Sequence, residues 1–249
     1  MLSIIPTTGH DAHFYESSSS LEYLTKSLTD GKKHLLLAAS GSVATIKLPV
    51  IISLLSSHSN LSIRVLLTSA ASQFLNGSSR EQPTISEILS LPNVDAVYRD
   101  QDEWGPQPWI RGKGVLHIEL RRWADLLVIA PLSANTLAKI VGGHSDNLLT
   151  SVVRAWDTDG GIDGRRKRIL VAPAMNSAMW RHPITAKQIK TLEDDWGVKE
   201  TADQQVDSGW FEVIKPISKT LACGDTGDGA MASAETIAGI VKERLDLTE

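Results

Sequence analysis

The sequence predicts an α/β protein whose mostly parallel sheet is covered by helices on both faces. Short, nearly continuous apolar runs alternate along the chain with segments of helical spacing. Strands buried on both faces of a parallel sheet give such runs, and helices of this length make the crossovers between them. In addition, four of the runs end in loops of small and hydroxyl or amide residues. An open α/β sheet binds its ligand at this position.

The first predicted strand is "KHLLLAAS", Lys33 to Ser40, and a helix follows it in "SVATIKLPVIISLLSSH". Pro49 either interrupts that helix or starts its regular part. The later elements continue the alternation. Strands are expected at 62–69, 95–100, 124–131 and 168–174, and helices at 84–91, 133–143, 146–156 and 184–196.

Length and composition describe one globular domain. The chain has 249 residues, of which 42% are hydrophobic and 22% charged, which is sufficient for a sizeable core. Residues 1–30 are rich in serine and threonine and show no sustained period. We therefore predict a flexible N-terminal arm over residues 1–30 and a single domain over residues 31–249.

Charge and cysteine content argue against several classes of protein. The formal net charge is -4, whereas nucleic-acid and anionic-membrane partners normally require clustered Lys and Arg. We interpret the one basic run, Arg165 to Arg168, as a solvated loop. The single cysteine, Cys223, excludes an internal disulfide and suits a reducing compartment. We predict a cytoplasmic protein, because no apolar run approaches the roughly 18 residues of a membrane span. We also predict that it has no metal site.

The candidate site lies where the predicted strands end. Four loops carry the signal, "SGSVA" at Gly41, "TSAAS" at Thr68, "APLSANT" at Ser133 and "APAMN" at Ala174. Loops at the carboxyl ends of parallel strands form one crevice, so these segments should converge. Gly41 and Ser42 open a helix whose free N–H groups favour a phosphate. The alternative is that each polar residue only caps a helix.

The loops also limit the kind of ligand. "GSVATIK" lacks both the GK[ST] of a phosphate-binding P-loop and the G-x-G-x-x-G dinucleotide fingerprint. This absence argues against ATP and against a dinucleotide. A mononucleotide with one terminal phosphate and a flat ring fits the four loops better.

Five ordered blocks carry a resemblance to a known family. They are "AASGSVA", "VLHIELRRWADLLVIAPLSANTLAKI", "DNLLTSVVRAWD", "VAPAMNSAMW" and "LACGDTGDGAMA". Together they resemble the flavin-dependent cysteine decarboxylases, in particular those that convert phosphopantothenoylcysteine to phosphopantetheine in coenzyme A biosynthesis. The resemblance implies a flavodoxin-like Rossmann fold, bound FMN and a homotrimer with active sites between subunits.

The resemblance also implies roles for individual residues. His117 of "VLHIEL" matches the family's catalytic histidine, and Asn176 of "PAMN" matches the residue that holds the substrate carboxylate. Cys223 of "LACGD" matches the proton donor on a mobile flap. The further substrate contacts that the resemblance implies are Met179, Lys219 and Ala222. The FMN contacts that it implies are Gly41, Ser42, Thr68, Ser69, Ser133, Ala134, Asn135, Thr136 and Ala174.

Without the resemblance, structural alternatives apply to these residues. A lone histidine is more often structural, and a lone cysteine is usually buried, although the Gly- and Asp-rich surroundings of Cys223 favour exposure. Asn176 also suits a helix cap. Trp104, Trp109 and Trp123 cluster around the His117 segment, which agrees with a subunit interface because tryptophan is enriched there.

Two segments depart from the compact family pattern. The loop at 158–168 is longer, and "TADQQVDSGWFEV", residues 201–213, adds chain before the flap.

Three other functions stay open. They are decarboxylation of a peptide's C-terminal cysteine, inhibition of a protein phosphatase by a non-catalytic flavoprotein, and flavin prenyl transfer. Phosphatase-inhibiting relatives tend to have incomplete catalytic sets, whereas this chain has His117, Asn176 and Cys223.

Overall fold

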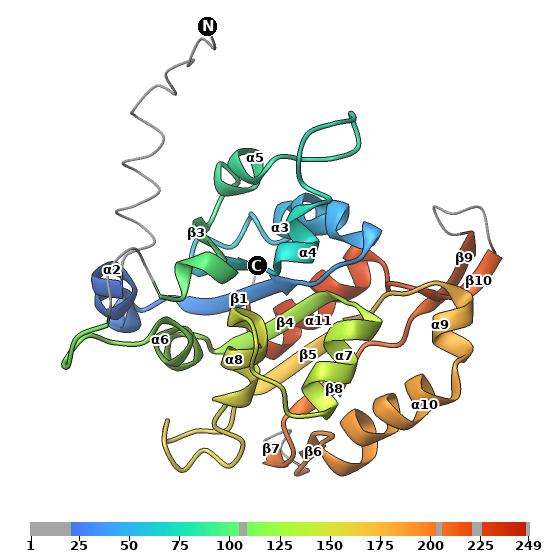
Figure 1. The fold of residues 1–249 in the computed structure, drawn as a ribbon. Helices are drawn as coiled ribbons and strands as arrows, with labels where there is room; N and C mark the ends of the chain where they lie inside the picture. The colour runs from blue at the N-terminus through green and yellow to red at the C-terminus, as the bar shows by residue number, and fades with distance from the viewer. Residues whose placement is uncertain (1–20, 105–108, 203–205, 221–225, 248–249) are drawn as a thin grey trace, which may run out of the picture.

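A six-stranded parallel sheet forms the centre of the computed structural model, which describes residues 21–104, 109–202, 206–220 and 226–247 (Figure 1). Every neighbouring pair in the sheet is parallel. In spatial order, the strands are β3 (Val94–Arg99), β2 (Leu61–Leu67), β1 (Lys33–Ala39), β4 (Leu126–Leu132), β5 (Arg168–Pro173) and β8 (Phe211–Val213). The predicted parallel sheet and its five predicted strands are confirmed.

The sixth strand was not predicted. β8 lies inside the segment 201–213, which was expected only to add chain before the flap, and pairs with β5 through Phe211 and Ile169. A strand of three residues is too short to show a period in the sequence. Two short antiparallel pairs lie outside the main sheet. They are β6 (Lys199–Glu200) with β7 (Val206–Ser208), and β9 (Ile217–Thr220) with β10 (Thr226–Ala230).

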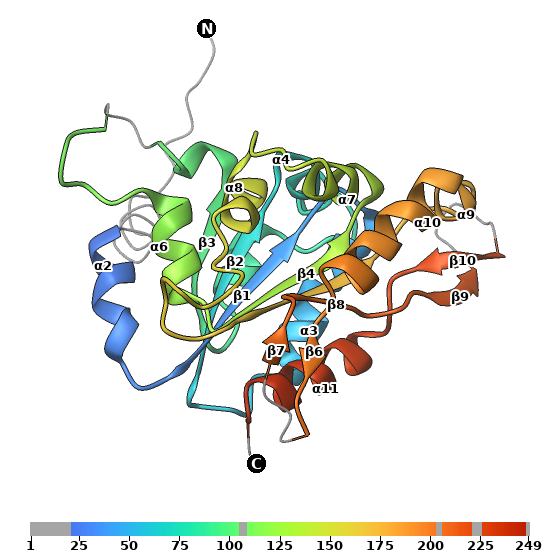
Figure 2. The same cartoon turned by 90° about the horizontal axis from the view of Figure 1, so that it is seen from below.

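Helices cover both faces of the sheet, as predicted; Figure 2 shows α3 and α11 on one side and α7 and α8 on the other. The first face packs against α3 (Leu48–Leu54), α4 (Ser69–Ser72), α5 (Ile85–Leu89) and α11 (Ala234–Arg244). The second packs against α2 (Leu21–Lys26), α6 (Leu116–Trp123), α7 (Ala134–Val141), α8 (Leu148–Arg154) and α10 (Pro183–Lys190). None of these described helices has the length and hydropathy needed to cross a membrane.

The alternation of side chains along the strands divides the core into two layers. In β1, Leu35 and Leu37 belong to one layer, whereas Leu36 and Ala38 belong to the other, and all four are fully buried. Successive residues of a strand point to opposite faces, so a strand covered on both sides is apolar throughout. This is why the strands appear in the sequence as continuous apolar runs.

Short helical turns complete the connections. They are the 3-10 turns η1 (Ser27–Thr29), η2 (Val43–Lys47) and η3 (Asp100–Asp102), the π turn η4 (Thr191–Asp195) and the short helix α9 (Ser177–Arg181). Pro49 lies in the first turn of α3, directly after η2. Its missing N–H costs nothing there, because the first N–H groups of a helix lack partners. Pro49 therefore starts the regular part of the helix, which was one of the two predicted alternatives.

Part of the predicted N-terminal arm is helical. Residues 1–20 lie outside the described residues, but α2 and η1 fall within the predicted arm of residues 1–30. Leu24 of α2 is fully buried, and the buried Arg64 donates to Ser27 Oγ at 3.1 Å. The Arg64 guanidinium also lies 4.8 Å from the ring centre of Trp123. Burial against the sheet thus orders a segment whose own sequence shows no period.

The three tryptophans near His117 differ in their surroundings. Trp123 is 1% exposed and stacks on His34 with ring centres 4.5 Å apart, so it belongs to the core. Trp104 and Trp109 are exposed, at 67% and 52%. Trp123 therefore gives no support to a subunit interface. Of the three tryptophans, only Trp104 and Trp109 are exposed enough to contact another subunit.

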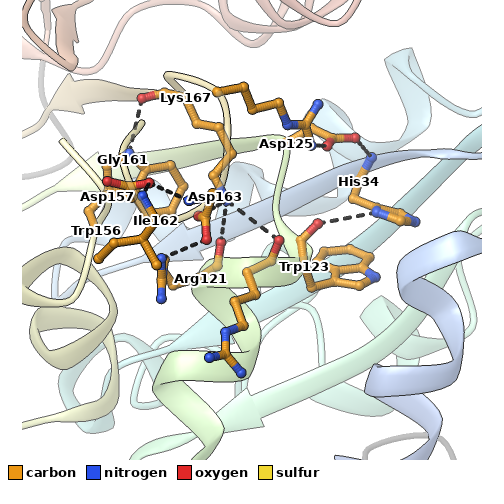
Figure 3. Close-up of polar contacts among 12 residues, drawn as sticks. His34, Arg121, Trp123, Asp125, Trp156, Asp157, Gly161, Ile162, Asp163 and Lys167 are labelled. Carbon is orange, nitrogen blue, oxygen red and sulfur yellow. Dashed lines mark hydrogen bonds and ion pairs between the residues drawn. The ribbon is translucent and has the colours of Figure 1, made fainter. Parts of the chain in front are cut away.

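A buried ionic network holds the longer loop at 158–168 against the fold (Figure 3). Arg121 Nη1 lies 2.7 Å from Asp163 Oδ1, and Lys167 Nζ lies 2.7 Å from Asp163 Oδ2. At most 9% of each of these three side chains is exposed. Asp157 accepts two backbone N–H groups of the loop, at 2.6 and 2.9 Å. The loop is therefore a packed part of the domain.

The network also closes the C-terminal end of α6, the helix that carries His117. Lys167 Nζ donates to the carbonyl oxygen of Arg121 at 2.7 Å and to that of Arg122 at 3.4 Å. These carbonyls lie in the last turn, where oxygens lack helical partners and a cation is favourable. Burial lowers the pKa of the Lys167 amine, and Asp163 offsets part of that effect.

The interpretation of the basic run 165–168 as a solvated loop is right for Arg165 and Arg166, which are exposed, and wrong for Lys167 and Arg168. Lys167 is 3% exposed, and the side chain of Arg168 is 12% exposed and lies 2.6 Å from Glu200. Arg165 pairs with Asp125. The partners of Arg165 and Arg168 lie far away in the sequence, whereas Asp163 lies four residues before Lys167. The run alone does not show that these charges are matched.

Replacing Asp163 with alanine should lower the free energy of unfolding by roughly 3–5 kcal/mol, because two buried cations would lose their carboxylate. Urea denaturation at neutral pH measures this change. Asp194→Ala is the control, since its pair with Lys190 spans 4.0 Å and is well exposed. We expect the control to change stability by less than about 0.5 kcal/mol. Equal effects of the two substitutions would contradict the proposed role of the network.

Candidate active site

A cleft of about 600 Å³ lies at the carboxyl ends of β1, β2, β4 and β5. Four loops from distant parts of the chain form its wall, as the sequence predicted. All nine predicted cofactor contacts line it, together with Asn176 and Met179. The nine are Gly41, Ser42, Thr68, Ser69, Ser133, Ala134, Asn135, Thr136 and Ala174.

The polar residues of these loops also cap helices. Ser42 accepts a hydrogen bond from Ala44 N at 3.4 Å, and Thr68 accepts one from Ala71 N at 3.2 Å. Ser133 caps α7 in the same way, with its Oγ 3.3 Å from the N–H nitrogen of the third residue after it. Helix capping and ligand binding, the two alternatives for these loops, are therefore compatible. Capping fixes each loop and directs the start of a helix toward the cleft.

Close contacts bring the loops together. A Cβ atom on Gly41 would lie only 2.6 Å from the Cβ of Ala70, so the β1 and β2 loops touch at a point where only glycine fits. Ser40 Oγ donates to the carbonyl oxygen of Pro131 at 3.0 Å and accepts from Ser133 N at 2.8 Å. This pair of hydrogen bonds joins the ends of β1 and β4, where the strand order of the sheet reverses.

Asp100 is a cleft residue that the sequence reasoning missed. Its Oδ2 accepts from Ser69 N at 2.8 Å and from Ser69 Oγ at 2.6 Å, and its Oδ1 accepts from Leu148 N at 3.4 Å. Asp100 thus links the β2 loop to the start of α8. It directly follows β3, so the rule of polar residues at strand ends applies to it as well.

The sequence reasoning missed further lining residues, some of them inside the four quoted loops. They are Val43, Ala70, Phe74, Lys139, Asp146, Asn147 and Met175. Lys139 Nζ lies 2.6 Å from Asp146 Oδ2, and this hydrogen bond lowers the pKa of the Asp146 carboxyl. Asn147 caps α8, with its Oδ1 2.9 Å from Thr150 N. A sequence shows such residues as ordinary caps and surface charges.

Asn176 lies at the start of α9 and is exposed toward the cleft. Its Oδ1 accepts from Met179 N at 2.9 Å, so Asn176 is a helix cap. This bond fixes the side-chain oxygen and leaves the amide NH₂ as the group free to meet a ligand. An NH₂ group donates, and a carboxylate only accepts. Asn176 can therefore cap the helix and hold a carboxylate at the same time.

The two-stranded ribbon β9–β10 packs against this segment. Gly229 accepts from Met175 N at 2.9 Å, and a Cβ on Gly227 would lie 1.6 Å from Ser177 Oγ. The base of the ribbon is thus in direct contact with the residues on both sides of Asn176. Lys219 belongs to β9. Ala222, a predicted substrate contact, and Cys223, the predicted proton donor on the flap, lie outside the described residues.

His117 does not line the cleft of its own chain. It lies in the first turn of α6, and its Nδ1 is 2.6 Å from Glu103 Oε1. The side chain of His117 is 22% exposed and that of Glu103 is 6% exposed. The structure therefore brings together the predicted cofactor contacts, Asn176 and Met179, but leaves the predicted catalytic histidine outside the cleft.

Comparisons with curated proteins confirm the resemblance found in the sequence. Phosphopantothenoylcysteine decarboxylase of Arabidopsis thaliana is 44% identical over 214 residues, which cover 86% of each chain. A probable thymidylate synthase of Schizosaccharomyces pombe is 41% identical over 224 residues. That match covers 90% of this chain, which spans only 31% of the longer protein.

Solved structures give the same result. A phosphopantothenoylcysteine decarboxylase mutant complexed with pantothenoylaminoethenethiol matches with a TM-score of 0.67 and 41% identity, over 86% of this chain and 99% of the other. The FMN binding protein AtHal3 matches with a TM-score of 0.66 and 42% identity, over 88% and 99%. The peptidyl-cysteine decarboxylase EpiD, at 22% identity and a TM-score of 0.56 over 84% and 98%, shares the fold.

The model of the flavoprotein family matches residues 24–246, which include every described residue of the cleft. The chain belongs to the flavoprotein family.

Proposed function

We propose that this protein is an FMN-dependent decarboxylase that converts phosphopantothenoylcysteine to phosphopantetheine in coenzyme A biosynthesis. The observation that carries the proposal is the cleft, in which nine predicted flavin contacts lie beside an asparagine able to hold a carboxylate. The identity of 44% to a phosphopantothenoylcysteine decarboxylase over most of both chains supports the choice of substrate.

The cleft suits FMN in size and in lining. Its volume of about 600 Å³ lies within the range of roughly 300–1,000 Å³ that ligand pockets occupy. Gly41, Ala134 and Ala174 leave room for a flat ring to approach the backbone, and the capped helix starts offer N–H groups to a phosphate. AtHal3, which is described as an FMN binding protein, supports the same cofactor.

The substrate explains the need for a flavin. Its cysteine nitrogen is an amide, so it cannot form the imine that usually stabilises the electron pair left by departing CO₂. When bound, FMN supplies a hydride acceptor for the cysteine β-carbon and later returns the hydride. The thiol loses its proton as the β-carbon is oxidised, which gives a thioaldehyde next to the carbon that bears the carboxylate. CO₂ then leaves its electron pair to the C=S group. The resulting enethiolate needs a hydride and a proton to become the saturated thiolate, and a second proton gives the thiol.

The chain's own residues would orient and protonate the substrate. Asn176 would hold the carboxylate through its NH₂ group, since its oxygen is used in the cap. His117 would accept and move the proton during oxidation and decarboxylation, and Cys223 would protonate the enethiolate. Positioned acid–base groups typically contribute about 10²–10⁴-fold to a rate, so losing one should stop turnover without unfolding the protein.

We further propose a homotrimer in which His117 of one subunit completes the cleft of its neighbour. His117 lies outside the cleft of its own chain, so a single chain lacks a complete site. Trp104, Trp109 and Ile110, which precede His117 in the sequence, are exposed at 67%, 52% and 58%. Large apolar side chains on the surface beside an incomplete site favour burial in a subunit interface. A cytoplasmic location stays a prediction from the sequence.

The first prediction from the proposed function concerns the cofactor. The purified protein should be yellow and release FMN on denaturation. Gly41→Ala should weaken FMN binding at least about tenfold, because the added methyl would lie only 2.6 Å from the Cβ of Ala70 and force the two loops apart. Quenching of flavin fluorescence during titration measures the affinity. Gly239→Ala in α11 is the matched control, since its methyl would meet no atom within 4 Å. Wild-type protein that fails to bind FMN would refute the cofactor.

The second prediction concerns the reaction. Purified protein loaded with FMN and incubated with phosphopantothenoylcysteine should release CO₂ and phosphopantetheine in equal amounts, because the flavin is restored in each turnover. Radiometric CO₂ capture and mass spectrometry of the thiol measure the two products. A peptide that ends in cysteine should react far more slowly. FMN-loaded protein that forms neither product would favour a non-catalytic flavoprotein, and preference for the peptide would favour peptidyl-cysteine decarboxylation.

The third prediction concerns the shared site. His117→Asn and Asn176→Asp proteins should each be inactive, whereas co-expressed chains should recover about one quarter of wild-type activity, because random assembly pairs an intact His117 with an intact Asn176 at that frequency. Light scattering should show a trimer in every case. If both residues served the same subunit, mixed trimers would show no recovery.

A further inference from the structure

Glu103 is a buried acid whose contact with His117 needs an explanation. Its Oε1 lies 2.6 Å from His117 Nδ1, and its side chain is only 6% exposed. Among the described residues, no donor reaches the other oxygen, Oε2, which is buried as well. A buried carboxylate is costly unless a hydrogen-bond partner replaces the water that it has lost. In the described part of the chain, the imidazole is that partner.

The turn that carries Glu103 is held in place by its own carboxylates. Asp102 Oδ2 accepts from Arg99 N at 2.7 Å, which closes η3 directly after β3. Two residues earlier, Asp100 binds Ser69 and reaches the start of α8. The position of Glu103 is therefore fixed relative to the sheet. Its carboxylate lies against the Nδ1 side of the His117 ring.

We infer that Glu103 is a positioning residue, which sets the orientation and the tautomer of His117. An ionised carboxylate only accepts hydrogen bonds, so the hydrogen between the two groups belongs to Nδ1. When the imidazole is neutral, Nε2 carries the lone pair and points away from Glu103. The inference rests on the proposed function, in which His117 accepts a proton. With Nδ1 occupied by Glu103, Nε2 is the nitrogen that meets the substrate.

A purely structural ion pair would predict a different result. In that case the loss of Glu103 would weaken the fold or the subunit contacts, and the ring state of His117 would have no bearing on turnover. The two possibilities separate when the tautomer and the kinetics are measured on the same variants.

The test uses Glu103→Gln in the full chain, with Asp102→Asn as the matched control. Glutamine keeps the size of the side chain, but its NH₂ can donate to Nδ1 and so favour hydrogen on Nε2. Asparagine at position 102 removes a charge from the same turn and still accepts from Arg99 N. Nitrogen NMR of protein labelled with ¹⁵N-histidine reports the tautomer, and the spectrum of His117→Asn identifies the signal of His117 among the seven histidines.

We expect wild type and Asp102→Asn to show the Nδ1–H form of His117 and equal turnover. Glu103→Gln should populate the Nε2–H form and lose at least about tenfold in kcat, with KM changed less than about threefold. Wild-type turnover in Glu103→Gln, or reduced turnover with the Nδ1–H form retained, would overturn the inference. An Nε2–H form in the wild type would overturn it too. If the wild type is inactive toward phosphopantothenoylcysteine, the proposed function fails, while the tautomer spectra still test the pairing of Glu103 with His117.

Discussion

The site depends on the hydrogen bonds of Ser40, which join the carboxyl ends of β1 and β4. Parallel strands place all their carboxyl ends at one edge. From β1 the sheet continues to one side through β2 and β3, and from β4 it continues to the other side through β5 and β8. The loops that leave these two strands diverge, and a crevice opens between them. Ser40 bonds to Pro131 and Ser133 across this crevice, so its floor is part of the sheet. The remaining loops of the cleft are built onto that floor by caps and by the contact of Gly41 with Ala70.

The helix α6 shows how parts outside the cleft serve it. Lys167 closes the C-terminal turn of α6 from the longer loop, and Glu103 meets His117 at the start of the same helix. Both contacts come from charged side chains that are almost completely buried. Charges removed from water keep their partners in one geometry, because an unpaired charge would be costly there. In the proposed trimer, this arrangement would present His117 to the neighbouring cleft in a defined orientation.

Much of the fold and part of the site could be predicted from the sequence. The five main strands were recognisable because burial on both faces makes a strand apolar throughout, and the four loops because small and polar residues follow those strands. The cap and ligand alternatives for Asn176 could not be separated, since one amide group can serve both purposes. The position of Asn176 beside the predicted flavin contacts followed from parallel strand ends.

Other features depend on contacts between distant residues and leave no local pattern. β8 is recognised only through its pairing with β5, and the burial of Lys167 only through its hydrogen bonds to the end of α6. Trp123 and the basic residue Lys167 gave misleading signals, because tryptophans and basic residues occur on surfaces and in cores alike. Asp100 followed the strand-end rule, but a single acid after a strand is too common to stand out.

The most direct test of the account is a crystal structure of the protein with FMN. It should show the flavin in the cleft between the loops of Gly41, Ser133 and Ala174. It should also show His117 of the partner subunit facing that cleft, with its Nδ1 still on the partner subunit's Glu103. FMN bound elsewhere, or a flavin that no neighbouring subunit approaches, would contradict the account.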